Sequence, residues 1–582
     1  MPDCPFNPAA ENIADLIYRF GSLQSERWNN TSSLCADYVS SDYIILHMPL
    51  TPDAVSMRVH PYYMIPSLFS PLDYNAMEAS GILSAFNSPA LNNQGKGVLI
   101  GLVDTGIDYR SPLFQNPDGT TRIAGIWDQS VPIEEDVLPA GVPDYYPMGG
   151  SSYGTEYTRE QINEALASDD PLSLVPTQDT IGHGTFLAGL AAGSSIPQED
   201  FTGAAPEAEL AVVKLKPAKK YLRDFYLIPS DAPAFQENDI MMGIKYLRMM
   251  ADRLKKPLVI LLAMGSNSGS HIGTSPLSQV TQNYSGFFGI ITVIACGNET
   301  GAAHHFYASI PAGTEYEDVE IRVGKEEAER GFVLELWAAD ADTYTVGFIS
   351  PSVERISRIP IIANNETSIP FLLDATTITV NYQLIEAESG SQLIFMRFQT
   401  PAAGIWTVRV YNTQRFKGTF HMWLPVQGMI SEETVFLRPD PYSTITVPGN
   451  SRLPITVGAY DTSTGGIYIH SSRGFTPNQI VKPELAAPGV NILGPSVGRK
   501  PGSDTPMTTR TGTSAAAAIT AGAAANLLGW GIVEGNYPTM SEASVKSYLI
   551  RGAQRNPALT YPNREFGYGT LDLFQTFLRL RE

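Results

Sequence analysis

GVLIGLVDTG, at residues 97–106, is an almost continuous apolar run that ends in turn residues. Such a run is typical of a parallel strand that is buried on both faces of a sheet. The same texture recurs in AELAVVKLK at 208–216, PLVILLAMG at 257–265 and GIITVIACG at 289–297. NDIMMGIKYLRMMADRLKK, at 238–256, lies between two of these runs and has helical character. The alternation predicts an α/β fold with a doubly wound, mostly parallel sheet.

A different texture interrupts this pattern between about 310 and 435. Apolar and polar residues alternate there along short segments such as 319–323 and 406–410, with Gly and Pro recurring between them. Alternation of this kind predicts antiparallel strands with one face in water, as in a sandwich or jelly roll. We therefore expect an inserted antiparallel, jelly-roll-like β-domain, which stabilises the parent domain and takes no part in its chemistry.

The α/β texture then resumes with PITVGAY at 454–460, KPELAAPGV at 482–490 and a small-residue helix at 513–530. Residues 1–76 match neither texture; they contain one predicted helix, NIADLIYRFG at 12–21, and one predicted strand, DYIILHMPL at 42–50. The predicted organisation is an N-terminal extension at 1–76, the α/β domain at 77–309 and 441–582, and the inserted β-domain at 310–440.

Composition excludes several classes of function. The 582 residues carry a formal charge of −20, which opposes binding to nucleic acid or to an anionic membrane surface. The longest apolar runs are shorter than the ~20 residues that a bilayer requires, and the N-terminus does not resemble a secretory signal. Three widely spaced cysteines, Cys4, Cys35 and Cys296, argue against a disulfide framework or a zinc site. We expect a chain in a reducing compartment, with no nucleic-acid or membrane partner.

Three short motifs carry residues suited to nucleophilic catalysis: VDTGID at 103–108, GHGTFLAG at 182–189 and GTSAAAA at 512–518. Asp104 follows a predicted strand, at the sheet edge where open α/β folds place catalytic groups. His183 and Ser514 each begin a predicted helix, whose dipole favours a neutral imidazole and a developing oxyanion. The glycines beside His183 would let a substrate backbone approach. Each residue alone has a plainer interpretation, as a turn Asp, a core His or a capping Ser.

Together, in the order Asp, His, Ser, the three motifs resemble the signature of the subtilases. The resemblance covers roughly residues 90–305 and 440–582 and implies a subtilisin-like fold with Asp104, His183 and Ser514 as the catalytic triad. It also implies that Asn298, in IACGNET, donates its side-chain amide to the oxyanion, together with the Ser514 N–H. The strand that contains Ala263, Met264, Gly265, Ser266 and Gly269 would bind substrate through its backbone. Ala517 and Ala263 depart from the usual Pro and Ser of the family.

Within this family the chain is most similar to the clostridial germination-type Csp proteases. DGTTRIAGIWDQS at 118–130, SNSGSHIG at 266–273, AYDTSTGGIYIHSSRGFT at 459–476 and the inserted β-domain carry that similarity. It implies a serine endopeptidase that works through an acyl-enzyme and a prodomain-like role for residues 1–76. Known members process the zymogen of a spore-cortex lytic enzyme, whereas some relatives have lost triad residues.

A general intracellular degradative protease and a catalytically idle scaffold remain the alternatives. We expect a monomer that acts on a protein or peptide substrate and is cytoplasmic or spore-associated. The residues indicate no cofactor and no metal ligands, and they leave a calcium requirement open.

Overall fold

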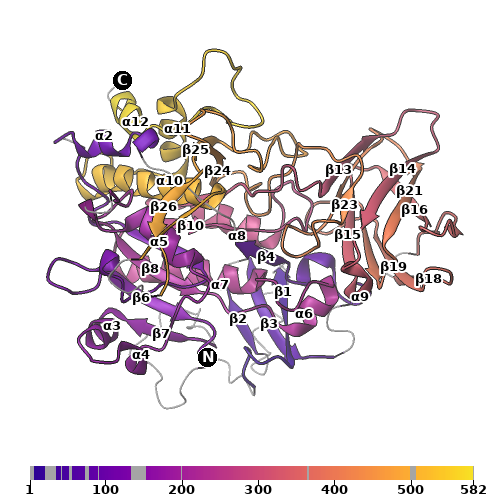
Figure 1. Ribbon diagram of the computed structural model, residues 1–582, viewed down its shortest axis with the longest axis horizontal. Helices are drawn as coiled ribbons and strands as arrows, with labels where there is room; N and C mark the ends of the chain where they lie inside the picture. The colour runs from indigo at the N-terminus through magenta and orange to yellow at the C-terminus, as the bar shows by residue number, and fades with distance from the viewer. Residues whose placement is uncertain are drawn as a thin grey trace.

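The structure is a computed structural model that describes residues 6–580, except 20–34, 41, 52–55, 72–77, 90, 133–152, 198–199, 363–365 and 499–505. Figure 1 shows an α/β part at the left, a β-rich lobe at the right and a small sheet from the N-terminal region below them. The helices are α2 (Ile82–Phe86), α3 (Arg159–Leu166), α4 (Pro171–Leu174), α5 (His183–Ala192), α6 (Lys220–Tyr226), α7 (Glu237–Leu254), α8 (Pro276–Ser285), α9 (Glu327–Arg330), α10 (Thr513–Leu528), α11 (Glu542–Gly552) and α12 (Leu573–Arg579).

An eight-stranded sheet forms the centre of the α/β part, in the order β25-β24-β12-β10-β5-β8-β6-β7. Its neighbouring strands are parallel, except that β7 runs antiparallel to β6. The strands are β5 (Leu99–Asp104), β6 (Ile123–Asp128), β7 (Thr155–Thr158), β8 (Glu209–Lys214), β10 (Leu258–Leu262), β12 (Ile290–Ala295), β24 (Ile455–Tyr460) and β25 (Leu485–Pro488).

Helices cover both faces of this sheet, because successive side chains of each strand point in opposite directions. In β5, Ile100 and Leu102 pack into the apolar cluster that contains α5 and α10. Leu99 and Val103 pack into a second cluster, with α7 and α8. The predicted α/β class, with a doubly wound and mostly parallel sheet, is therefore confirmed.

Helix α10 packs against the sheet and against α5, and all of its residues are buried. Within the described residues, Thr513–Val533 is long and apolar enough to cross a membrane by composition alone, but 83% of its most apolar window is buried inside the protein. A helix that is apolar on every side belongs in the core of a large domain. We therefore assign α10 as the central core helix of the α/β part.

The β-rich lobe is a sandwich of two antiparallel sheets that share one apolar core. One sheet has the order β13-β22-β15-β20-β19-β18 and the other β17-β16-β21-β14-β23. The strands are β13 (His305–Ser309), β14 (Tyr316–Val323), β15 (Phe332–Ala338), β16 (Thr343–Ile349), β17 (Arg355–Ile356), β18 (Glu366–Phe371), β19 (Thr376–Gln383), β20 (Leu393–Gln399), β21 (Gly404–Gln414), β22 (Thr419–Trp423) and β23 (Val435–Phe436). The lobe thus begins at His305, slightly ahead of the boundary expected at 310.

The prediction that every strand of this lobe has one wet face is correct for β14 and wrong for β15. In β14, Val319, Ile321 and Val323 are buried and the residues between them are exposed. All seven residues of β15 are buried. The face of β15 that carries Val333 and Trp337 packs on α6 and on the N-terminal region, so this outer face is an interface between parts of the chain.

The N-terminal region forms a three-stranded sheet in the order β1-β3-β2, with β1 (Ile13–Arg19), β2 (Ala36–Tyr38) and β3 (Tyr43–Pro49). The helix predicted at 12–21 is wrong, whereas the strand predicted at 42–50 is confirmed by β3. All seven residues of β1 pair antiparallel with β3. Because that partner lies about thirty residues further along the chain, local periodicity could not reveal the strand.

A disulfide bond also departs from the sequence prediction. Cys35 is disulfide-bonded, whereas Cys296 is a buried free thiol and Cys4 lies outside the described residues. The spacing of the cysteines argued against a disulfide framework, and the bond at Cys35 departs from that expectation.

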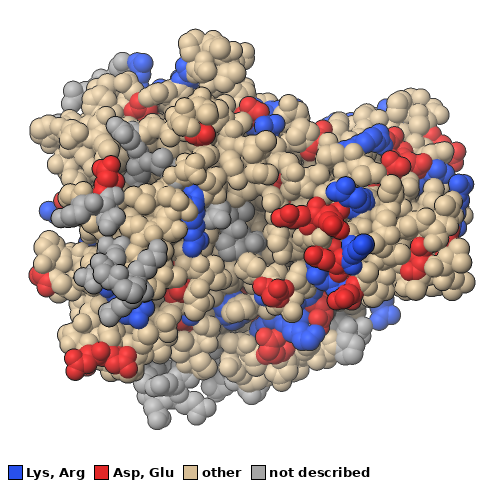
Figure 2. Space-filling model, viewed as in Figure 1, with Lys and Arg blue, Asp and Glu red and all other residues tan. Residues whose placement is uncertain are grey.

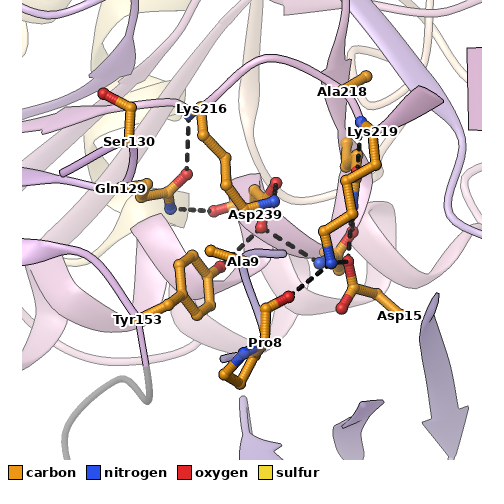
Figure 3. A network of polar contacts seen from close by, with 12 residues as sticks. Pro8, Ala9, Asp15, Gln129, Ser130, Tyr153, Lys216, Ala218, Lys219 and Asp239 are labelled. Carbon is orange, nitrogen blue, oxygen red and sulfur yellow. Dashed lines mark hydrogen bonds and ion pairs between the residues drawn. The ribbon is translucent and has the colours of Figure 1, made fainter. Parts of the chain in front are cut away.

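Buried charges attach the N-terminal sheet to the α/β part (Figure 3). Lys219 Nζ lies 2.7 Å from Asp15 Oδ2 and donates hydrogen bonds to the carbonyl oxygens of Pro8 and Ile13. Beside this pair, Lys216 Nζ lies 2.5 Å from Asp239 Oδ2. Side chains from β1 and from the α/β part thus satisfy each other in a site closed to solvent.

His47 on β3 extends the same cluster. Its Nδ1 lies 2.7 Å from Asp15 Oδ1 and its Nε2 lies 3.2 Å from Asp37 Oδ2. Burial alone would lower the pKa of His47, but hydrogen bonds to the two carboxylates outweigh it and raise that pKa to about 9. The imidazolium form therefore stabilises the N-terminal sheet.

Charge on the molecular surface is mixed. On the described part of the face shown in Figure 2, acidic and basic side chains are interspersed and no continuous basic surface forms. This distribution gives a polyanion no extended binding surface on that face.

We predict that stability falls as the pH rises from about 6.5 to 9, because His47 then loses its proton in the folded state. The raised pKa corresponds to about 3 kcal/mol of stabilisation, fully present below pH ~6.5 and lost above pH ~9. Denaturant unfolding of the parent and of His47→Gln, measured from pH 6 to pH 9.5, checks this. The difference between the two proteins should shrink steadily with pH, and a difference independent of pH would contradict the assignment.

Candidate active site

Asp104 and His183 meet at the carboxyl end of the central sheet. Asp104 is the last residue of β5, and His183 is the first residue of α5. His183 Nδ1 lies 2.7 Å from Asp104 Oδ1, and each residue is only 2% exposed. A buried carboxylate at Nδ1 holds that proton, fixes the tautomer and leaves Nε2 as the basic nitrogen.

Asp179, which the sequence analysis missed, organises the loop that leads to His183. Its Oδ1 accepts hydrogen bonds from Thr105 Oγ1 at 2.9 Å and from the Gly182 N–H at 2.7 Å. Its Oδ2 accepts from the N–H and the hydroxyl of Thr185, at 2.9 and 2.7 Å. An Asp shortly before a helix start is a capping signal and could have been recognised in TQDTIGHGT.

Gly184 has a different role from the one predicted. A Cβ at this position would lie 2.1 Å from the carbonyl oxygen of Gly106 and 3.2 Å from Asp104 Oδ1. Its N–H donates to Thr105 Oγ1 at 2.9 Å. Gly184 therefore lets α5 approach the loop after β5, and it faces the chain's own backbone.

Ser514 and Asn298 lie near each other, at the start of α10 and in the loop after β12. Ser514 is the second residue of α10, and its Oγ is buried without a hydrogen-bond partner among the described residues. The Thr513 N–H donates to Asn298 Oδ1 at 3.1 Å, and the Gly297 N–H donates to Thr513 Oγ1 at 3.2 Å. The amide oxygen of Asn298 is thus occupied, which leaves its amide nitrogen as the donor.

A second nucleophile near this loop is unsuited to the role. Burial raises the pKa of the Cys296 thiol to about 12, so the thiol stays protonated. The structure therefore favours the serine hydroxyl over the neighbouring thiol.

The residues of the segment predicted to bind substrate, 263–269, contact several other parts of the chain. Ala263 is buried in the apolar core, and β11 (Met264–Gly265) pairs antiparallel with β4 (Leu68–Pro71). Ser266 exchanges backbone hydrogen bonds with Val447, at 3.0 and 2.9 Å. The Gly269 N–H donates to Glu335 Oε2 at 2.9 Å. The expectation that Ser266 and Gly269 pair with a substrate strand is therefore wrong for their N–H groups, which are already bound within the chain.

Strand β4 lies between two edge strands of the α/β part. It pairs with β11 on one side and with β9 (Phe235–Gln236) on the other. No local pattern predicted this strand, because its two partners come from two other regions of the chain. A segment of the N-terminal region thus occupies a slot suited to one extended peptide.

Among the residues that the structure describes, no group of three or more His, Cys, Asp or Glu side chains is arranged to hold a metal ion. The side chains described above, a carboxylate, an imidazole, a hydroxyl and an amide, are groups suited to nucleophilic catalysis.

A central parallel sheet that carries Asp, His and Ser at these three positions defines the subtilisin-like class of proteases. Sequence comparison agrees: the model of the subtilase family matches residues 95–328 and 438–569, more than half of the chain. The chain belongs to the subtilase family.

Individual relatives extend this result. The subtilisin-like proteases SBT3.5 and SBT3.12 of Arabidopsis thaliana are 23% and 24% identical, over 87% and 81% of this chain. The alignments cover 64% and 59% of those proteins, so the chain spans less than two thirds of their length. Among solved structures, the Clostridium perfringens CspB protease is 30% identical with a TM-score of 0.74, over 87% of this chain and 97% of that one.

We predict that Gly184→Ala lowers kcat/KM for a peptide substrate by roughly 10²-fold or more, because the added methyl group forces His183 away from Asp104. Peptide hydrolysis and thermal unfolding should both be measured. Gly466→Ala is the control, since a Cβ there meets its nearest atom at 3.3 Å. Full activity of Gly184→Ala would show that the close contact is not required.

Proposed function

We propose that this protein is a serine endopeptidase in which Ser514 attacks the peptide carbonyl and His183 accepts its proton. The observation that carries the proposal is the 2.7 Å contact between His183 Nδ1 and Asp104 Oδ1. The start of α10 lies at the same sheet edge, because Thr513 Oγ1 accepts from the N–H of Gly297, which follows the parallel strand β12. The proton taken by His183 returns to the leaving amine, and water then hydrolyses the acyl-enzyme by the same path. Asp104 stabilises the imidazolium that forms in each half of the reaction.

The negative charge that develops on the carbonyl oxygen has two donors in this proposal. Asn298 supplies its side-chain amide, and the Ser514 N–H at the N-terminus of α10 supplies the second. The hydrogen bond from Thr513 to Asn298 Oδ1 supports this assignment, because it orients the amide group relative to the helix that carries the nucleophile.

The substrate is proposed to bind as an extended strand between β11 and β9. Strand β4 supports this mode, since a segment of the chain already forms backbone pairs with both edges. A peptide substrate must therefore replace residues 68–71 in the slot. Without substrate, the proposed binding slot is consequently occupied by the chain itself. This occupancy suits a processing protease better than a general degradative one.

The proposed substrate class is a specific protein such as a spore-cortex lytic zymogen, as the resemblance to the Csp group implies. Similarity to the Clostridium perfringens CspB protease over nearly all of that chain supports this choice. General degradation and a catalytically idle scaffold are the alternatives. Cleavage-site proteomics on a lysate of the source organism separates processing of a specific protein from general degradation, because a processing enzyme produces a few dominant new termini.

We predict that a fluorophosphonate probe labels the protein at Ser514 and that Ser514→Ala abolishes both labelling and peptide hydrolysis. The substitution is small and buried, so the unfolding temperature should stay close to that of the parent. Mass spectrometry of the labelled peptide identifies the modified residue. Absence of labelling in a correctly folded parent would favour the idle scaffold.

We further predict that Leu68→Ala raises kcat/KM for a peptide substrate by roughly 3- to 30-fold. Leu68 is 3% exposed and anchors β4 in an apolar cluster with Tyr62 and Phe225. A Leu→Ala change in a core costs about 2–5 kcal/mol, and part of that loss falls on the bound state of β4. Leu222→Ala, in the same cluster but on α6, is the matched control. Equal effects of both variants would refute occupancy of the slot by β4.

A further inference from the structure

The β-sandwich touches the candidate active site through the segment that follows β22, residues 424–427. Gln427 Nε2 donates a hydrogen bond to the backbone carbonyl oxygen of Asn298 at 2.6 Å. The Gln427 N–H donates to Glu299 Oε1 at 3.1 Å. Two consecutive residues of the proposed oxyanion loop are therefore held by one residue of the sandwich.

Glu299 connects this contact to the substrate edge. The side chain is 3% exposed, and its Oε2 accepts from Asn267 Nδ2 at 3.1 Å and lies 3.1 Å from His304 Nδ1. Asn267 Nδ2 also donates to the carbonyl oxygen of Leu424 at 3.1 Å. The Leu424 N–H donates in turn to the His304 carbonyl oxygen at 2.9 Å. These bonds form a closed ring around a buried carboxylate.

The loop needs such external support because its own backbone is permissive. Gly297, which precedes Asn298, has a φ of +101° and gives the chain freedom of rotation at that point. The amide oxygen of Asn298 is anchored to Thr513, and its carbonyl oxygen is anchored to Gln427. The two anchors act at opposite ends of the residue, so together they fix the direction of the amide nitrogen.

We infer that Gln427 is a positioning residue for the oxyanion donor, and that the β-sandwich takes part in catalysis through it. The inference rests on the proposed function, in which Asn298 stabilises the oxyanion. Such stabilisation depends on donors held in place before charge develops. The sandwich thus does more than stabilise the parent domain.

Gln427→Ala and the isosteric Gln427→Glu test the inference, because each removes the donor to Asn298. Gln427 is exposed, so neither change disturbs a core. We expect kcat to fall about two- to tenfold, the range of one hydrogen bond, with KM and the unfolding temperature unchanged. Affinity for a peptide boronic acid, which forms a tetrahedral adduct with the nucleophilic serine, should fall by the same factor. Gln414→Ala, at an exposed position of the same sandwich, should leave all these quantities unchanged.

A double-mutant cycle tests whether Gln427 changes kcat by acting through Asn298. Asn298→Ala alone should lower kcat by about 10²–10³, the loss measured for the corresponding donor in subtilisin. If Gln427 acts through Asn298, adding Gln427→Ala to that variant should lower kcat no further.

Three outcomes would overturn the inference: an unchanged kcat in both Gln427 variants, a raised KM with a lowered unfolding temperature, or full additivity in the cycle. Fluorophosphonate labelling of the parent separates these results from failure of the proposed function. A labelled parent with any of them rejects only the role of Gln427, whereas an unlabelled parent rejects the proposed reaction itself.

Discussion

The pairing of Asp104 with His183 depends on a close backbone contact between two loops. Helix α5 can approach the end of β5 only because residue 184 lacks a Cβ, which would lie 2.1 Å from the Gly106 carbonyl oxygen. Asp179 binds both sides of this contact, through Thr105 and through the N–H groups at the helix start. The proposed base is thus oriented by bonds within the α/β part, and its geometry is set before any substrate arrives.

The separate parts of the molecule are joined by buried carboxylates. Asp15 joins the N-terminal sheet to Lys219, and Glu335 of the sandwich accepts from Tyr62 Oη at 2.5 Å and from the Gly269 N–H. Burial also raises the pKa of Glu335. An unpaired buried charge is costly, so each carboxylate favours the one arrangement in which its partners are present. These buried contacts therefore specify how the N-terminal sheet, the sandwich and the α/β part pack against one another.

The central sheet could be predicted because local pattern and tertiary role agree there. The run at 97–103 is apolar throughout and its strand is buried on both faces, and each motif of the proposed triad follows a strand or begins a helix. Prediction failed where a distant partner decides the outcome. Segment 13–19 is a strand because β3 pairs with it, and Glu335 is buried because Tyr62 and Gly269 approach it. No local pattern contains those partners.

The two halves of the proposed site are consequently held in place by different parts of the chain. His183 is oriented by Asp104 and Asp179, which both belong to the α/β part, whereas Asn298 is anchored partly by the sandwich through Gln427. On the proposed mechanism, a displacement of the sandwich would therefore alter stabilisation of the oxyanion and leave the Asp104–His183 contact in place. Since Asn267, which binds Glu299, lies two residues after the end of β11, the same displacement would also reach the proposed substrate edge. The fold thus couples the proposed substrate edge to the proposed oxyanion donor, whereas contacts within the α/β part hold the Asp104–His183 pair.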